Sequence, residues 1–217
     1  MKIVNDPTEQ TTAATDVLLA LVAGAGLFYL HRPVPPNGNL WKIAIWTAAI
    51  GLIGLSATLG AVAHGLVLSP AVHRRIWRVL NMALALTVSL FVVGVAYDLW
   101  GLSISSAVLP IMLGAGLGFY LVTLRYPGIF FLFIVYEALA LSFALGAYCL
   151  LAIRGTLPGA GLMATGILIS ITAALIQANK TLSVALIWKF DHNGIYHLVQ
   201  MLGLAVLLLG LQRSLAG

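Results

Sequence analysis

Histidine and aspartate side chains gather in one short segment, residues 191–197, which reads DHNGIYH and precedes the last long apolar run of the chain. The whole sequence has only five histidines and six acidic residues, and Asp191, His192 and His197 lie together in this segment. Imidazole groups bind transition metals and transfer protons near neutral pH, and carboxylates assist both kinds of chemistry. The segment is therefore the first candidate for a functional site.

Four polar residues open the first apolar run: Glu9, Thr12, Thr15 and Asp16. Their offsets of three, six and seven place them on roughly one face of a helix, because successive residues are rotated by about 100°. Threonines and acids also suit the first turn of a helix, so a simple helix start explains the group equally well.

His64 lies near the end of the second apolar run, with Gly60 one turn and Ser56 two turns before it, and Asn81 lies about one turn into the third run. With helices of alternating direction, all of these residues reach the same end of a bundle as residues 191–197. A single histidine such as His64 is more often a buried, hydrogen-bonded residue than a ligand. A second histidine at the same depth would favour a shared site.

The composition indicates that membrane-spanning helices position these residues. The chain is 61% hydrophobic and 8% charged, whereas soluble domains have about 25% charged residues. A span needs about 20 apolar residues, and the runs here are long and continuous rather than alternating as in a β-barrel. The sequence therefore predicts an all-α integral membrane bundle of seven transmembrane helices in a single domain, residues 1–217.

Seven apolar runs define the predicted helices. Segment 180–190, KTLSVALIWKF, is apolar enough to lie at the membrane interface or to extend either neighbouring helix. The predicted spans are residues 12–30, 40–68, 76–100, 103–123, 127–153, 158–179 and 194–211.

The net charge of +5 comes from basic residues that separate the apolar runs. This arrangement indicates membrane orientation and membrane lipid as partner rather than nucleic acid, since basic residues are enriched on the cytoplasmic side. If the seven spans cross the membrane in alternating directions, seven basic residues lie on the same side of the membrane as the N-terminus and four lie on the other side. We therefore expect a cytoplasmic N-terminus and an extracytoplasmic C-terminus. The first group is Lys2, Arg74, Arg75, Arg78, Arg125, Lys180 and Lys189, and the second is Arg32, Lys42, Arg154 and Arg213.

Other ionisable residues lie apart from this predicted site. His31 and Asp98 are expected at the opposite surface. Glu137 lies about ten residues, or about 15 Å, into the fifth run. At that depth it needs a proton or a partner, and the sequence does not identify the partner. The single Cys149 excludes an internal disulfide.

The polar positions form an ordered series of short motifs, one for each of four helices. These are Glu9-x-x-Thr12-x-x-Thr15-Asp16 in the first run, Gly60-x-x-x-His64 in the second, Asn81 in the third, and Asp191-x-Asn193-x-Ile195-Tyr196-His197 at the last.

With these motifs the chain resembles the superfamily of seven-helix membrane hydrolases that includes the alkaline ceramidases, the adiponectin and progestin receptors and GPI-lipid remodelling proteins. Members of that superfamily carry Glu-x-x-Asn-x-x-Ser-Asn at the start of the first helix and Ser-x-x-x-His in the second. They also carry an aspartate in the third helix and His-x-x-x-His in the seventh. The resemblance covers all the predicted spans in order.

The resemblance implies a zinc ion held by three histidines, with a metal-bound water that attacks a lipid amide or ester while a serine and an aspartate assist. Here His64 and His197 match two of the metal ligands, and Asn193 takes the place of the third. Gly60 stands at the serine position and Asn81 at the aspartate position. In an enzyme, Asn81 and Asn193 would orient the water or the substrate carbonyl.

His192 could supply the missing histidine only if the last helix begins after Gly194, because residues five apart on a helix differ by about 140°. Asp16, Asp191 and Glu9 are alternative oxygen ligands. Alternatively, the asparagines and histidines form a hydrogen-bonded network without a tight zinc ion.

Three functions remain open on the sequence. One is a zinc-dependent membrane hydrolase of lipid amides or esters. The second, which we favour because the serine, aspartate and histidine of the motifs are all substituted, is a non-catalytic relative that binds a lipid or serves as a membrane subunit. The third is a haem or electron-transfer protein with His64 and His197 as axial ligands.

Overall fold

The computed structural model describes residues 2–32, 39–126, 130–185 and 187–216. Within these ranges the chain forms six helices and one short β-hairpin, so the prediction of a helical protein is confirmed apart from the hairpin. The elements are α1 (Pro7–Leu30), α2 (Leu40–Gly65), α3 (Pro70–Arg125), α4 (Phe130–Arg154), α5 (Ala160–Ala178), β1 (Ser183–Ala185), β2 (Lys189–Asp191) and α6 (His192–Ala216).

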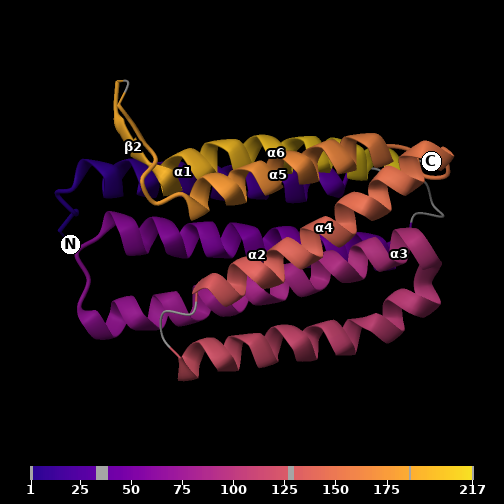
Figure 1. The fold of residues 1–217 in the computed structure, drawn as a ribbon, viewed down its shortest axis with the longest axis horizontal. Helices are drawn as coiled ribbons and strands as arrows, with labels where there is room; N and C mark the ends of the chain where they lie inside the picture. The colour runs from indigo at the N-terminus through magenta and orange to yellow at the C-terminus, as the bar shows by residue number, and fades with distance from the viewer. Residues whose placement is uncertain (1, 33–38, 127–129, 186, 217) are drawn as a thin grey trace.

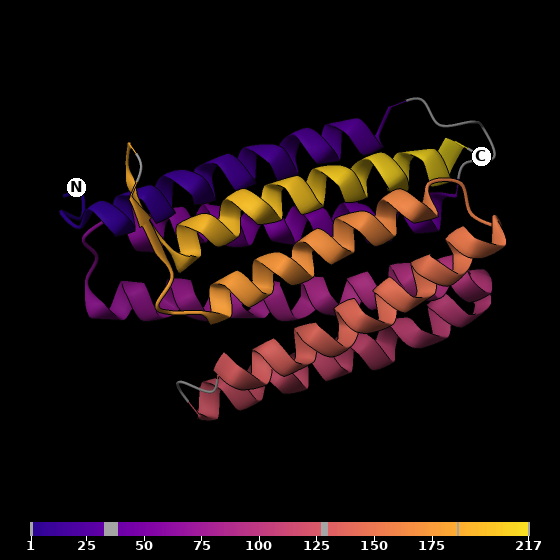
Figure 2. The ribbon, with the colours of Figure 1, turned by 45° about the horizontal axis from the view of Figure 1, so that its top comes forward.

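The helices form a closed ring. Each helix contacts the next one along the chain, and α6 contacts α1. Figure 1 shows the N-terminus and the C-terminus at opposite ends of the long axis, and Figure 2 shows α6 running between α1 and α5. A ring of this kind encloses an interior to which every helix contributes one face.

The predicted third and fourth helices are two arms of α3. Gly101 has φ 80 and ψ −174, a conformation that essentially only glycine adopts, and the chain reverses its direction there (Figure 1). The arms lie side by side, since Ser105 Oγ donates to the carbonyl of Val93 at 2.9 Å and Ser89 Oγ donates to that of Met112 at 2.7 Å. The described residues thus form six helices rather than the predicted seven, because one non-helical residue reverses the chain without ending α3.

The segment between α5 and α6 contains a β-hairpin, so of the two alternatives predicted for residues 180–190 the extension of a neighbouring helix is wrong, while a location at the membrane interface stays a prediction. α5 stops because Asn179 Oδ1 accepts hydrogen bonds from the backbone N–H of Thr181 at 3.3 Å and from its hydroxyl at 2.7 Å, which turns the chain. β1 and β2 then pair in antiparallel fashion. The hydroxyl of Thr11 donates to the carbonyl of Lys189 at 2.7 Å, so β2 is tied to the start of α1.

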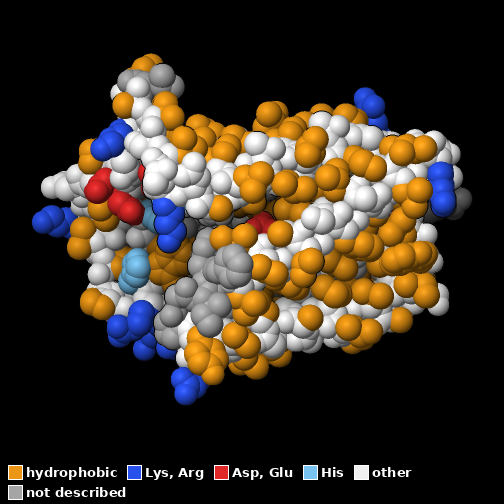
Figure 3. Space-filling view, in the orientation of Figure 1, with side chains coloured by type: hydrophobic (Ala, Val, Ile, Leu, Met, Phe, Trp, Pro, Cys, Tyr) orange, Lys and Arg blue, Asp and Glu red, His pale blue; other side chains and the backbone are white. Residues whose placement is uncertain are grey.

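The helices have the length and surface of membrane spans. In the part of the chain that the structure describes, all six are long and apolar enough to cross a bilayer. Figure 3 shows hydrophobic side chains over the middle of the visible face, with Lys and Arg side chains towards the two ends of the long axis. A bilayer with a core about 30 Å thick favours such a distribution. The chain is therefore a multi-pass membrane protein.

The first residues of the chain hold α1 against the end of α2. Asp6 caps α1 by accepting hydrogen bonds from the backbone N–H of Thr8 at 2.8 Å and from its hydroxyl at 2.6 Å. These bonds lower the pKa of Asp6 below its ordinary value. Val4 N–H donates to the carbonyl of Gly65 at 3.1 Å. The first turns of α1 therefore lie beside the last turn of α2, which contains His64.

A buried ion pair joins four elements at the opposite end of the bundle. Lys42 Nζ lies 2.5 Å from Asp98 Oδ1, and the two side chains are 3% and 1% exposed. Lys42 also donates to Ser214 Oγ at 2.8 Å, and the hydroxyl of Tyr148 donates to Asp98 Oδ2 at 2.9 Å. Asp98 thus lies at the end of the bundle opposite the polar cluster, as expected, but it is buried rather than exposed, and Lys42 is not a surface charge. Both residues lie near helix ends that the ring brings together.

Candidate functional site

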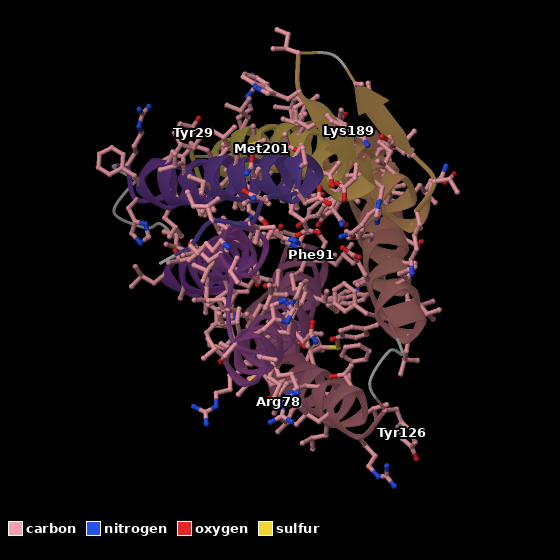
Figure 4. All side chains as sticks on the ribbon, turned by 90° about the vertical axis from the view of Figure 1, so that its left-hand side faces the viewer. Tyr29, Arg78, Phe91, Tyr126, Lys189 and Met201 are labelled. Atoms are coloured by element: carbon pink, nitrogen blue, oxygen red, sulfur yellow. The ribbon has the colours of Figure 1, made fainter. Side chains whose placement is uncertain are left out.

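The interior of the ring contains a cavity of about 640 Å³ that receives side chains from all six helices. The first arm of α3 lines it from His73 and Arg74 to Phe91, and the second arm contributes Phe119 and Tyr126. Arg74 and Phe91 are about 26 Å apart at 1.5 Å per residue. Figure 4 looks into the bundle from the end that carries the N-terminus, with Phe91 in the interior and Arg78 and Tyr126 on the α3 side. The cavity is therefore long and runs along the bundle axis.

The lining changes from polar to apolar along this axis. The end near the N-terminus has histidine, asparagine and arginine side chains beside aromatic ones such as Trp77 and Tyr126, whereas the other end is aromatic and aliphatic. The polar end is lined by Arg74, Arg78, His64, Asn81, Asn193 and His197, and the apolar end by Trp46, Ala49, Ile50, Phe91, Leu204 and Leu207.

Most residues predicted for the site meet at the polar end of this cavity. Seven of them line it, four lie behind its wall in contact with lining residues or with each other, and His192 lies outside the lining with its Nδ1 3.9 Å from Asp191 Oδ2. The seven are Asp16, Ser56, Gly60, His64, Asn81, Asn193 and His197, and the four are Glu9, Thr12, Thr15 and Asp191.

His197 is held by two neighbouring residues of α1. The hydroxyl of Thr15 donates its proton to the carbonyl of Thr12 at 2.9 Å, so it accepts from His197 Nδ1 at 3.0 Å. His197 Nε2 lies 3.3 Å from Asp16 Oδ1. Thr15, Asp16 and His197 are all buried. Both ring nitrogens of His197 are therefore occupied by contacts within the protein, and Thr15 is not presented to the cavity.

Asp191 fixes the start of α6 and connects it to α1. Its Oδ1 accepts hydrogen bonds from Gly194 N–H at 2.9 Å and from the hydroxyl of Thr12 at 3.0 Å. Its Oδ2 accepts a longer one, 3.4 Å, from the amide of Asn193. A carboxylate at a helix N-terminus stabilises the unpaired backbone N–H groups there. Asp191 thus positions Asn193 in the cavity wall.

His64 pairs with the remaining acid of the α1 group. Its Nδ1 lies 2.7 Å from Glu9 Oε2, and the edge of the Trp77 ring packs against it with centroids 5.7 Å apart. No other described residue forms a hydrogen bond with this imidazole. Nε2 of His64 is thus the ring nitrogen left for a molecule in the cavity.

Asp16 occupies the space next to Gly60, where the resembled family has a serine. A Cβ atom at Gly60 would lie 2.6 Å from Asp16 Oδ2 and 2.9 Å from its Cγ, so only glycine fits without a shift. Ser56 does not replace the serine, because its hydroxyl donates to the carbonyl of Leu52 at 2.9 Å. Asp16 Oδ2 is buried without a hydrogen-bond partner among the described residues. The polar end therefore offers an unpaired acceptor rather than a nucleophilic hydroxyl.

These donors fit the implied zinc site poorly. No three His, Cys, Asp or Glu side chains come together as a metal site within the described ranges. α6 begins at His192, so Asn193 and Gly194 are helical and His192 lies outside the cavity lining. His197 is engaged at both ring nitrogens. Zinc binding therefore stays a prediction that only the resemblance supports.

The structure adds lining residues that the sequence analysis did not assign to the site. Glu137 lines the cavity and forms no hydrogen bond with another described residue, and Trp77, Tyr196 and Gln200 complete the polar end. Tyr196 directly precedes His197, and Gln200 follows His197 by three residues, or about one helical turn. Their positions next to His197 could have identified both as site residues from the sequence. Glu137 is on α4, and only the closure of the ring shows which residues it faces.

Comparisons with known proteins give a family but no activity. No curated protein and no solved structure matches the chain. One family model, described as a family of unknown function (DUF6962), matches residues 11–216, which include the described residues of all six helices from Thr11 onwards. The chain belongs to this family, DUF6962.

Proposed function

We propose that the protein binds an amphiphilic membrane lipid in the cavity and does not convert it chemically. The cavity itself carries this proposal. Its volume of about 640 Å³ lies within the range of roughly 300–1,000 Å³ that small-molecule sites have. Its polar end suits the polar part of a lipid, and its apolar end suits an acyl chain.

The dimensions of the cavity support a lipid with a long chain. Its α3 wall of about 26 Å exceeds half of a bilayer core that is about 30 Å thick. Asp16 Oδ2 is buried and has no hydrogen-bond partner among the described residues. A buried acceptor of this kind is stabilised by a ligand hydroxyl, amide or water that donates to it.

The positions that would carry chemistry support binding over catalysis. Gly60 and Asn81 replace the serine and the aspartate of the resembled family, and Asn193 replaces a histidine. The hydroxyl of Ser56 is used by the backbone, and that of Thr15 lies behind the wall. The residues left can bind and orient a polar group, but none is an activated nucleophile.

Filling the cavity should displace the lipid. Ala140 on α4 is 7% exposed and lines the cavity, whereas Ala138 on the same helix is exposed. We expect the wild type to purify in mild detergent with about one lipid per chain, detected by native mass spectrometry and lipid extraction. Ala140→Phe should lose most of this lipid, since the ring occupies the cavity, while Ala138→Phe should retain it.

Equal lipid occupancy in a folded Ala140→Phe variant and in the wild type would contradict binding in this cavity. Both variants are checked first by thermal unfolding. The same preparation tests the other functions: stoichiometric zinc that is lost in His64→Ala would support the metal-dependent hydrolase, and a Soret band would support haem. We expect neither.

A hydrolase acting on lipid amides or esters is the second proposal, and the pairing of His64 with Glu9 favours it. A carboxylate at Nδ1 orients an imidazole so that Nε2 can accept a proton, which is the arrangement of a general base. Turnover of a fluorogenic lipid amide or ester that is abolished in His64→Gln would support this function. Binding without turnover would exclude it for the lipids tested.

The orientation in the membrane follows from the two arms of α3. A single helix of 56 residues would be about 84 Å long, so we propose that each arm crosses separately, which gives seven crossings. This agrees with the termini at opposite ends in Figure 1. The end with the N-terminus has seven exposed basic residues, and the other end has three, namely the predicted four without buried Lys42.

The N-terminus is therefore expected in the cytoplasm and the C-terminus outside it. A reporter that is active only in the cytoplasm should be active when fused before the first residue and inactive when fused after the last one. Activity at both ends would mean an even number of crossings and would contradict separate crossing by the arms of α3.

A further inference from the structure

Two arginines at the polar end of the cavity have no carboxylate partner in the part of the chain that the structure describes. Arg74 and Arg78 line the cavity and are exposed. They are four residues apart on α3, which places them on the same helix face, where like charges repel. No described Asp or Glu lies within ion-pairing distance of either guanidinium group. Of the acids near this end, Glu9 is paired with His64.

His73 adds a third donor to these arginines. The indole N–H of Trp77 donates to His73 Nε2 at 3.1 Å, so the proton of the neutral ring is on Nδ1 and can be donated to an anion. His73 also lines the cavity. We call His73, Arg74 and Arg78 the cavity mouth.

Orientation in the membrane explains basic residues at a helix end in general, but it does not explain this arrangement. Arg75 is exposed in the same turn of α3 and does not line the cavity, whereas Arg74 and Arg78 do. Guanidinium groups form paired hydrogen bonds with carboxylate and phosphate oxygens. An anion at the mouth would also relieve the repulsion between Arg74 and Arg78.

We propose that the lipid in the cavity has an anionic headgroup, which is bound at the mouth by Arg74, Arg78 and His73. This inference rests on the proposed lipid-binding function and names its ligand class. The anion belongs to a lipid and not to a free phosphate ester, because the mouth is continuous with a cavity whose other end is lined by apolar side chains.

Two lipids with the same acyl chain and glycerol test this inference, lysophosphatidate with an anionic headgroup and monoacylglycerol without one. The full-length protein in an uncharged detergent should bind lysophosphatidate about tenfold more tightly. Arg74→Gln/Arg78→Gln should lose most of that preference and keep its affinity for monoacylglycerol. Arg75→Gln/Lys180→Gln removes the same charge from exposed residues at the same end and should keep the preference.

Each of the other possible results of this binding experiment contradicts one step of the inference. Equal binding of the two lipids by the wild type would refute the anionic headgroup and leave lipid binding intact, whereas binding of neither lipid would refute the proposed function. An equal loss of preference in Arg75→Gln/Lys180→Gln would show a general charge effect. Competition by glycerol 3-phosphate as effective as by lysophosphatidate would show that the headgroup alone is the ligand. The single variants Arg74→Gln and Arg78→Gln give the same test if the double variant does not fold.

Discussion

Lys42→Met is expected to lower the free energy of unfolding by about 3–5 kcal/mol, because it leaves a buried carboxylate without its cation. Asp98 is 1% exposed at its side chain and would retain only the hydrogen bond from Tyr148. Ser214 would lose its hydrogen bond from Lys42 at the same time. Unfolding by a denaturing detergent, followed by circular dichroism, measures the loss.

Two further variants separate this effect from a general loss of charge. Arg213→Met removes an exposed cation on α6 near Ser214 and should change the free energy of unfolding by no more than about 0.5 kcal/mol. Lys42→Met/Asp98→Asn leaves no unpaired charge and should recover most of the loss. If Lys42→Met is no more destabilising than Arg213→Met, the ion pair does not stabilise the fold.

Much of the helical architecture could be predicted, because the length of a membrane span makes apolar runs easy to recognise. The chain reversal at Gly101 was correctly placed between two runs, which correspond to the two arms of the single element α3. The hairpin was missed, since three-residue strands produce no periodic pattern and the turn at Asn179 resembles any polar helix end.

The polar end of the cavity was also largely predictable. A polar residue in an apolar helix has to face the protein interior, so the helix ends at one side of the membrane identify residues such as His64, Asn81 and His197. The pairing of Glu9 with His64 and of Asp16 with His197 was not predictable. It depends on rotations of α1 against α2 and α6 that helical spacing does not determine.

The pair of Lys42 and Asp98 could not be found for a different reason. Charges within a turn of a helix end normally reach the lipid headgroups, and the sequence alone gives no sign that these two are covered. They are covered because Tyr148 and Ser214 come from helices that close the ring over them. Burial here is a consequence of the tertiary arrangement.

Gly60→Ala is expected to lower the free energy of unfolding by about 1–3 kcal/mol, because its Cβ would overlap a buried side chain. The new atom would lie 2.6 Å from Asp16 Oδ2 and 2.9 Å from Oδ1. Asp16 is 4% exposed, and its Oδ1 contacts His197. The carboxylate can move only into the cavity, which separates it from the imidazole. In an Asp16→Ala background the same substitution should cost less than about 0.5 kcal/mol, since the three atoms nearest to the new Cβ all belong to the Asp16 carboxyl group and are removed.

Gly51→Ala is the control for the helix, since a Cβ at Gly51 on α2 would meet no atom within 4 Å; it should not be destabilising. An equal cost of Gly60→Ala with and without Asp16 would show that the substitution acts through another contact. A cost that depends on Asp16 would show that its carboxylate fills the space beside Gly60. Because that carboxylate leaves no room there for the serine side chain that the resemblance would imply, and because Asp16 Oδ2 is an acceptor without a partner among the described residues, this result would favour the proposed lipid binding over catalysis.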